Sequence, residues 1–341
     1  MIIRRERIAR FKRYIIDCLR HATLKKVFNL IRVECKLAGN VPNLKNIYPY
    51  FFIVEISNAC NLRCPLCLMG QRKIIPRKNL MSIERYMSLM DPIKDYIFLV
   101  SLYNWGEPFL NQDIYKIIQF NTSHNIGTVV NSNFNAPVDG ERLVRSGLAH
   151  LVISGDGITQ AVYEKYRVGG KIDLVLDNLR KVVNAKKKYG SRLPHVEWQC
   201  LVTKWNETQL DDIKKKVLDL GVDEVRFSNI NFYSAENRQE AEAEWLPQNP
   251  IYRAFALKPV SSSKAFRKPC FWLWRTAVVN VNGGMAPCCL FDVPDWGNLF
   301  DEEFLSVWNG KRYIEARKFS RNNRNTRKAG LICDNCYEPL V

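Results

Sequence analysis

Strand-like apolar runs alternate with helix-like periodic segments between residues 50 and 228, and this alternation constrains the fold more than any other feature. We expect strands at 50–57, 96–103, 127–132, 149–154, 195–203 and 222–228, with helices near 81–92, 111–124, 139–146, 173–189 and 207–219. Strand–helix–strand units in series predict a parallel sheet with its helices outside. Six units fit an α/β fold of the partial (β/α)6, TIM-like barrel type better than a closed eight-stranded barrel, with chemistry at the carboxyl ends of the strands.

The pattern divides the chain into four parts. They are a basic amphipathic helical arm (1–48), the partial barrel (49–230), a linker (231–269) and a small C-terminal domain (270–341) in which the alternation stops and cysteine, glycine and tryptophan become frequent. The composition, 47% hydrophobic and 25% charged, is that of a globular protein rather than a disordered one.

The formal net charge of +17 is concentrated at the N-terminus, where residues 1–36 hold eleven Lys or Arg against three Asp or Glu, a net +8. Apolar residues recur at helical spacing in this arm, at Ile8, Phe11, Ile15, Cys18, Leu19 and Ala22. Two interpretations stay open: a helix packed on the main domain, or a helix on an anionic membrane surface. A second basic stretch, 317–330, is distant in sequence, and no recognition module accompanies either, which argues against nucleic acid.

The eleven cysteines follow no secretory signal, and no apolar run is long enough to span a bilayer. Clustered thiols in such a chain indicate metal ligands rather than disulfides. We therefore expect a cytoplasmic protein, with the basic arm raising the alternative of peripheral contact at the inner membrane surface.

Three cysteines, Cys60, Cys64 and Cys67, crowd the loop "CNLRCPLC" after the first expected strand. Structural zinc takes four ligands, and a fourth is missing nearby. Three thiolates on a four-iron cluster leave one iron open to another ligand. In this strand–loop context the Cys-x3-Cys-x2-Cys spacing resembles the radical S-adenosylmethionine (radical SAM) superfamily. The resemblance implies a [4Fe–4S] cluster whose open iron binds the methionyl amino and carboxylate groups of SAM. Reductive cleavage of SAM then gives a 5′-deoxyadenosyl radical, which takes a hydrogen atom from substrate.

Other strand ends agree with this resemblance. "YNWGEP" follows the second strand, and the resemblance assigns Glu107 to the SAM amino group. Further candidates for holding SAM come from the later strands: Asn131, Ser132, Asn133, Ser154, Asp156, Arg167 and Gln199. Alternation within "HVEWQCLVT" places Glu197 and Gln199 on the lumen face and Cys200 among the buried outer residues.

The C-terminal cysteines form a second pattern. Cys270, Cys288, Cys333 and Cys336 resemble the SPASM/twitch extension, which implies one auxiliary [4Fe–4S] cluster with all four irons ligated. Cys289 stays an alternative to Cys288, and a four-cysteine zinc site is the competing interpretation.

A closed auxiliary cluster suits electron transfer, so we expect net oxidation of the substrate, with epimerisation as the alternative. The arm before the first strand is too short for a separate peptide-binding domain, which favours a small polar substrate such as a sugar, aminocyclitol, nucleotide-sugar or lipid-linked glycan. The basic surface favours an anionic one. A ribosomally made peptide stays open as substrate. Flavodoxin or ferredoxin is the expected reductant, and a non-catalytic iron–sulfur electron carrier is the alternative from another class.

Overall fold

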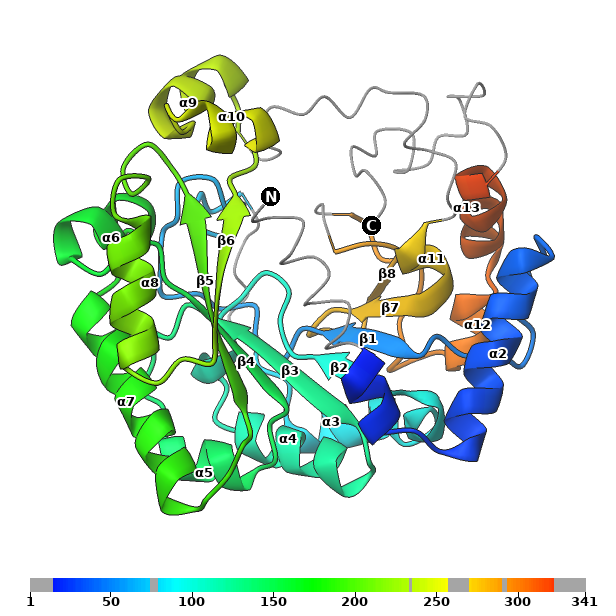
Figure 1. The fold of residues 1–341 in the computed structure, drawn as a ribbon. Coiled ribbons are helices and arrows are strands. Elements are labelled where there is room, and N and C mark those ends of the chain that lie inside the picture. The colour runs from blue at the N-terminus through cyan, green and yellow to red at the C-terminus, as the bar shows by residue number, and fades with distance from the viewer. Residues whose placement is uncertain (1–14, 74–78, 233–234, 257–269, 290–292, 322–341) are drawn as a thin grey trace.

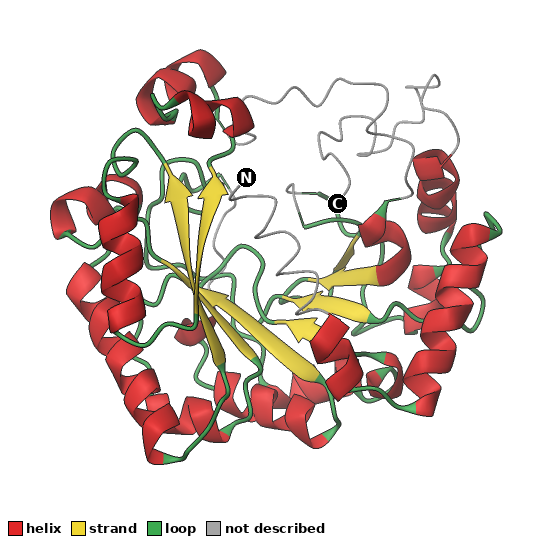
Figure 2. Ribbon diagram, viewed as in Figure 1, coloured by secondary structure: helices red, strands yellow, loops and turns green. Residues whose placement is uncertain are grey.

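The computed structural model describes residues 15–73, 79–232, 235–256, 270–289 and 293–321. Its centre is one sheet of eight strands in the order β6-β5-β4-β3-β2-β1-β7-β8, and Figures 1 and 2 show helices covering the outer side of this curved sheet. The α/β fold with a mostly parallel sheet is the one that the alternation predicted.

Six parallel strands form the barrel part and lie within the predicted stretches or one residue beyond them. They are β1 (Phe51–Val54), β2 (Leu99–Ser101), β3 (Gly127–Ser132), β4 (His150–Ser154), β5 (His195–Val202) and β6 (Glu224–Asn229). The register aligns Ser154 of β4 with Gln199 of β5, and Gln199 with Arg226 of β6. Side chains in one row across three strands therefore face the same side of the sheet.

The outer layer consists of the predicted helices and one more. The predicted ones are α3 (Ile83–Met90), α4 (Ile114–Ser123), α5 (Gly140–Arg145), α7 (Ile172–Lys188) and α8 (Leu210–Asp219). The added one is α6 (Gln160–Tyr166), and single turns η1 (Lys94–Tyr96) and η2 (Pro108–Leu110) follow α3 and β2. Capping fixes several starts: Ser82 accepts from Arg85 N and Asp139 from Arg142 N.

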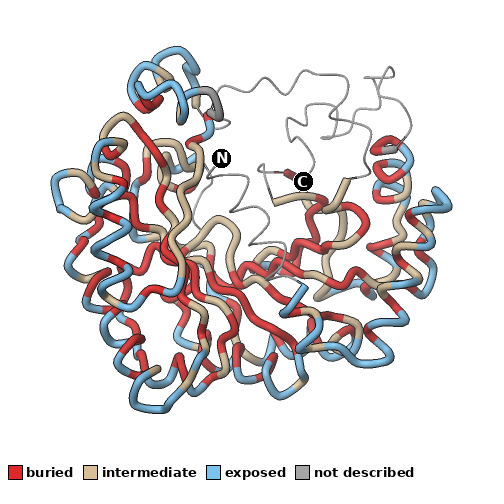
Figure 3. The backbone as a smooth tube through the Cα atoms, viewed as in Figure 1, coloured by how far each residue is buried: buried red, intermediate tan, exposed pale blue. Residues whose placement is uncertain are grey.

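The main core lies between the sheet and these helices (Figure 3). β5 shows how the sequence sets the two faces of the sheet. Val196, Trp198, Cys200 and Val202 are buried in this core, whereas Glu197 and Gln199 alternate with them and face the lumen. The prediction that Cys200 is a buried outer thiol is confirmed.

The C-terminal part continues the same sheet, which the sequence did not indicate. β7 (Thr276–Val279) pairs parallel with β1, and β8 (Met285–Ala286) pairs antiparallel with β7. Helices α11 (Phe271–Arg275), α12 (Phe304–Trp308) and α13 (Lys311–Arg321) accompany them. Glu55, just after β1, accepts hydrogen bonds from the amides of Trp105 and Val281 and so joins the barrel to the β7–β8 turn.

The N-terminal arm is helical, as predicted, and its described part is divided into two helical segments. Residues 15–20 are helical, the chain turns at His21, and α2 (Leu24–Ala38) begins anew because Thr23 caps it, its Oγ accepting from Lys26 N at 3.3 Å. No helix of the described residues is long and apolar enough to cross a membrane. The stretch predicted as a linker contains two short helices, α9 (Arg238–Trp245) and α10 (Pro250–Ala256).

Candidate active site

The three-cysteine loop leaves the carboxyl end of β1 and folds back tightly on itself. Cys67 N donates to Cys64 O at 3.2 Å, and Arg63 N donates to Val168 O at 3.0 Å. Gly70 closes the loop, because a Cβ there would lie 2.3 Å from Cys64 O. The loop thus gathers the three thiols at the strand ends, where the barrel prediction placed the chemistry.

The thiols suit a metal cluster. Burial, as the largest cause, raises the pKa of the Cys60 thiol to about 12 and also raises the pKa of the Cys64 thiol. Neighbouring cysteines add to both shifts. Buried thiolates therefore need a compensating cation, which a cluster supplies. Within the described part of the chain, no three Cys, His, Asp or Glu side chains converge on a single ion. A cubane offers each thiolate its own iron, so three cysteines in one loop suit a [4Fe–4S] cluster.

An apolar wall surrounds the cysteine loop. Leu62 and Cys64 pack in one buried cluster with Tyr166, Ile230, Phe232, Trp245 and Leu246, and Cys60 and Cys67 lie against it. Tyr166 meets Trp245 of α9 edge-to-face at 5.4 Å. The stretch predicted as a linker therefore helps to shield the cysteine loop from water, a role that no pattern in the sequence indicated.

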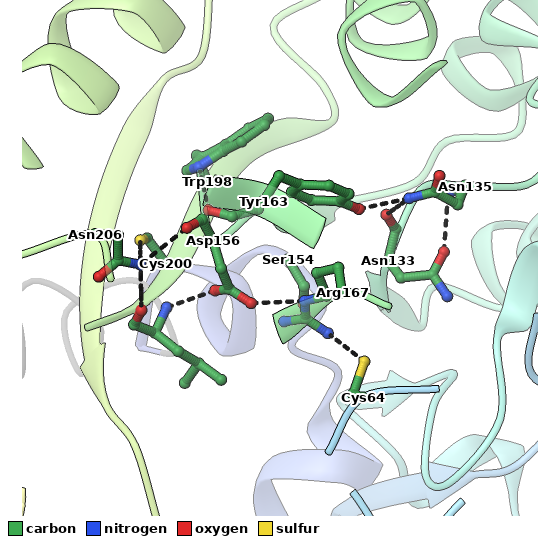
Figure 4. Close-up of polar contacts among 12 residues, drawn as sticks. Cys64, Asn133, Asn135, Ser154, Asp156, Tyr163, Arg167, Trp198, Cys200 and Asn206 are labelled. Atoms are coloured by element: carbon green, nitrogen blue, oxygen red, sulfur yellow. Dashed lines mark hydrogen bonds and ion pairs between the residues drawn. The ribbon is translucent and has the colours of Figure 1, made fainter. Parts of the chain in front are cut away.

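Arg167 and Asp156 form a buried ion pair beside the loop (Figure 4). Arg167 Nε lies 2.6 Å from Asp156 Oδ2, and its Nη1 lies 3.8 Å from Cys64 Sγ. Asp156 Oδ1 also accepts from Leu201 N at 2.7 Å, so this carboxylate is held on both sides. The "SGDG" turn is tight because Trp198 packs where a Cβ of Gly155 would lie, at 1.9 Å.

Glu107 is buried and binds the end of β3. Its Oε1 accepts from Ser132 Oγ at 2.6 Å and from Phe109 N at 3.1 Å, and its Oε2 accepts from Asn133 N at 2.8 Å. Burial, as the largest cause, raises the pKa of Glu107 to about 6 against these bonds. Asn133 Nδ2 in turn lies 3.8 Å from Cys60 Sγ. Glu107, Ser132, Asn133 and the cysteine loop therefore form one connected group.

The remaining candidates line the lumen. Ser154 Oγ donates to Asn131 Oδ1 at 3.0 Å, whereas Gln199 Oε1 accepts from Arg226 Nη2 at 2.8 Å. Arg226 also pairs with Glu197, and His150 Nε2 lies 3.1 Å from Glu197 Oε2. Burial opposes the ionised form of Glu197, yet His150 and Arg226 hold its pKa well below the ordinary value. Gln199 thus belongs to this polar row, in which it bonds to Arg226 and Ser228 of β6.

Sequence patterns did not identify several residues that hydrogen-bond to the site residues and hold them in position. Asn206 donates to the carbonyls of Asp156 and Leu201 at 2.9 and 2.8 Å, and Asn135 donates to Tyr163 Oη at 2.5 Å (Figure 4). Isolated asparagines and tyrosines carry no motif, so only the fold reveals that these side chains meet at the strand ends.

Two of the four predicted auxiliary ligands lie within the described residues. Cys270 directly precedes α11, and Cys288 lies two residues after the end of β8. Cys289 instead packs against an apolar cluster of Ile53, Val278, Ala286 and Val293. Cys333 and Cys336 lie outside the described residues.

Family models match two stretches of the chain. Residues 54–194 match the radical SAM superfamily, and residues 270–337 match SPASM, described as an iron–sulfur cluster-binding domain. Together the two matches include the cysteine loop, Glu107, the Asp156–Arg167 pair and all the predicted auxiliary cysteines.

Two curated relatives illustrate the range of similar proteins. The chain is 20% identical over 303 residues to the tungsten-containing aldehyde ferredoxin oxidoreductase cofactor-modifying protein of Pyrococcus furiosus, covering 80% of this chain and 84% of that protein. It is 27% identical over 161 residues to the mycofactocin maturase MftC of Mycolicibacterium smegmatis, covering 46% of this chain and 39% of MftC. The chain thus matches about two fifths of that maturase.

Solved structures share the fold. Streptococcus suis SuiB bound to S-adenosylmethionine superposes with a TM-score of 0.61 at 17% identity, covering 83% of this chain and 72% of SuiB. The AdoMet-bound anSMEcpe structure gives 0.57 at 16% identity, covering 80% of this chain and 84% of that one. At these identities the likeness shows the architecture alone.

Proposed function

The chain belongs to the radical SAM superfamily and carries an SPASM domain, and on that premise we propose that it takes a hydrogen atom from a small polar substrate and oxidises it. Its cofactors are S-adenosylmethionine, a [4Fe–4S] cluster that binds it and an auxiliary [4Fe–4S] cluster. When bound, these groups supply the electron that cleaves SAM and an acceptor for the electron that leaves the substrate radical.

The chain's own residues bind, orient and exclude water. We assign Cys60, Cys64 and Cys67 to the SAM-binding cluster, and Cys270, Cys288, Cys333 and Cys336 to the auxiliary one. Arg167, held by Asp156 beside Cys64, is oriented to meet the SAM carboxylate. The group of Glu107, Ser132 and Asn133 fixes the opposite wall near Cys60, while Ser154 and Asn131 offer polar atoms for the sugar of SAM.

The observation that carries the choice of a polar substrate is the row of hydrogen-bonding side chains across the lumen. Next to the Asn131–Ser154 pair that we assign to SAM, Gln199, Arg226 and Ser228 lie on β5 and β6, face the same side of the sheet and bond to one another. Such a row binds a ligand rich in hydroxyl or charged groups more tightly than an apolar one, which would leave its polar side chains without partners. Residues 15–50, moreover, lie against the barrel as helix and turns, which leaves the described arm without a domain of its own.

A peptide substrate is the second candidate. The SuiB fold also occurs with a bound precursor peptide, at a TM-score of 0.59. Reduced protein incubated with SAM and either precursor peptides encoded nearby or phosphorylated sugars separates the two. Each candidate compound is labelled with deuterium, and the substrate is the one whose deuterium appears in 5′-deoxyadenosine. Transfer of deuterium from the peptides alone would overturn the small-substrate proposal.

The mass of the product formed in D2O distinguishes oxidation from epimerisation. An epimerised product formed in D2O gains one solvent deuterium and keeps its mass otherwise, whereas an oxidised product loses two hydrogens and gains none.

We propose flavodoxin or ferredoxin as the reductant and a cytoplasmic setting, because thiolate-ligated clusters need a reducing compartment. A protein that never forms 5′-deoxyadenosine under reduction would instead be an electron carrier.

A further inference from the structure

Helix α2 packs on the barrel through a buried stripe that is half polar and half apolar. The buried stripe of this helix consists of Lys26, Asn29, Val33 and Leu37. Lys26 Nζ donates to Asn125 O at 2.5 Å, and Asn29 exchanges two hydrogen bonds with the backbone of Tyr48, at 2.9 and 3.1 Å. Hydrogen bonds to main-chain groups therefore contribute much of the attachment of α2 to the barrel, which leaves apolar side chains of the helix outside it.

The opposite side of α2 is apolar and exposed. Leu24, Val27, Phe28, Ile31 and Cys35 follow one another at spacings of three, one, three and four, the periodicity of a single helix face. Leu24 is 92% exposed, Phe28 64% and Ile31 51%. A surface helix of a soluble domain ordinarily has the reverse arrangement, so this face is built for an apolar contact.

Exposed apolar groups are concentrated in this one region. Among the described residues, fourteen large hydrophobic side chains are exposed, and seven of them lie between residues 15 and 31: Ile15, Ile16, Leu19, Leu24, Val27, Phe28 and Ile31. The others are scattered over the rest of the chain. A patch of this kind marks an interaction surface rather than the ordinary apolar fraction of a protein exterior.

Basic residues border the apolar face on one side. Lys25, Arg32 and Lys36 lie within about 40° of one another around the helix at 100° per residue. Lys25 pairs with Asp95 at 2.7 Å, and the Arg32 guanidinium lies 5.7 Å from the Phe28 ring centroid. The only acidic residue of α2, Glu34, is engaged with Arg275 at 2.6 Å. The sequence adds six Lys or Arg and one Glu in residues 1–14, so the whole segment is strongly positive.

We propose that the outward face of α2 docks on an anionic lipid bilayer, lying in the plane of the interface with Leu24, Phe28 and Ile31 toward the acyl chains. An apolar face bordered by Lys and Arg is the combination that such a surface binds. A second copy of this chain fits the face poorly, since a two-fold contact through α2 would set the same cationic border and basic arm against their own copies.

Docking through α2 leaves the β5–β6 end of the barrel uncovered. α2 lies at the edge of the molecule beside α12 and α13, on the β1 side of the sheet, while β5 and β6 lie on the other side (Figure 1). This proposal concerns where the protein works and stands apart from the identity of its substrate.

The test is co-sedimentation of the full, anaerobically prepared protein with vesicles of phosphatidylcholine, with or without phosphatidylglycerol. We expect binding only when the anionic lipid is present, and weaker binding at high salt. The variant Leu24→Ser/Phe28→Ser/Ile31→Ser should bind at least about ten-fold more weakly, because the inserted apolar area is lost. Arg32→Gln/Lys36→Gln should also reduce binding by about ten-fold and flatten its salt dependence.

A control variant removes two exposed apolar side chains elsewhere. Leu218 of α8 is 41% exposed and Ile251 of α10 is 66% exposed, so Leu218→Ser/Ile251→Ser should bind as the unaltered protein does. All variants should keep the circular dichroism spectrum and the SAM cleavage of the parent, which separates this proposal from the enzymatic one. Vesicle binding that is absent in the parent or intact in the triple serine variant overturns it, as does a dimer in sedimentation velocity that the triple variant abolishes.

Discussion

The guanidinium Nη1 of Arg167 lies 3.8 Å from the Sγ of Cys64. Arg167 comes from the C-terminal end of α6, a hundred residues after the cysteine loop, and Asp156 holds it in place at 2.6 Å. A fixed positive charge thus stands next to a predicted cluster ligand, and its proposed contact with the SAM carboxylate can be measured.

Replacing Arg167 by Gln should weaken SAM binding by about ten- to a hundred-fold, the effect of losing a charge-assisted hydrogen bond. Equilibrium dialysis on the reduced protein measures it. Arg167→Lys should retain part of the affinity through its charge. Arg180→Gln, which breaks an exposed Arg–Asp pair on α7, is the matched control and should change nothing. Unaltered affinity in Arg167→Gln with intact iron content would remove Arg167 from the SAM site.

Cys288 and Cys289 should behave differently although they are neighbours. Cys289 packs against the apolar cluster that contains Ile53 and Val278, which leaves Cys288 as the predicted ligand. We expect Cys288→Ala to lose the iron of the auxiliary cluster, about half the total, while Cys289→Ala keeps it. Iron analysis after anaerobic reconstitution decides between them. The opposite pattern would make Cys289 the ligand.

Glu55 should make the stability of the fold depend on pH. Burial is the main reason that its pKa rises from the ordinary 4.5 to about 7. Because the folded protein binds this proton more tightly than the unfolded chain does, the stabilisation is complete below the unfolded pKa and is lost as the pH rises through about 7. The full effect is about 3 kcal/mol for a shift of this size.

Thermal unfolding of apo-protein between mildly acidic and mildly alkaline pH measures this dependence. The variant Glu55→Gln, which cannot ionise, should lose that part of the slope. A slope equal to that of the parent would show that another group carries the pH dependence.

The sequence predicted the parts of the molecule whose signal is local. Alternation within "HVEWQCLVT" placed Trp198 and Cys200 in the outer core, and the strand before Cys60 placed the thiols at the carboxyl edge of the sheet. Both inferences depend on a periodicity of two or on adjacency along the chain, which a single sequence displays.

Long-range contacts were beyond such patterns. β7 joins β1 across more than two hundred residues, and Trp245 reaches the cysteine-loop cluster from a stretch predicted as linker. The orientation of α2 was also unpredictable, since periodicity locates an apolar stripe but not whether it faces inward. Here the bonds of Lys26 and Asn29 to main-chain carbonyls decide the orientation.

The central claim is that Cys60, Cys64 and Cys67 hold the cluster at which SAM is cleaved, separately from the auxiliary one. The most direct measurement compares iron content and 5′-deoxyadenosine formation under strong reductant in the parent protein and in Cys60→Ala/Cys64→Ala/Cys67→Ala. We predict about eight irons per chain and SAM cleavage for the parent, against half the iron and no cleavage for the variant. A parent protein that binds zinc without iron–sulfur absorption, or a variant that still cleaves SAM, would contradict the account.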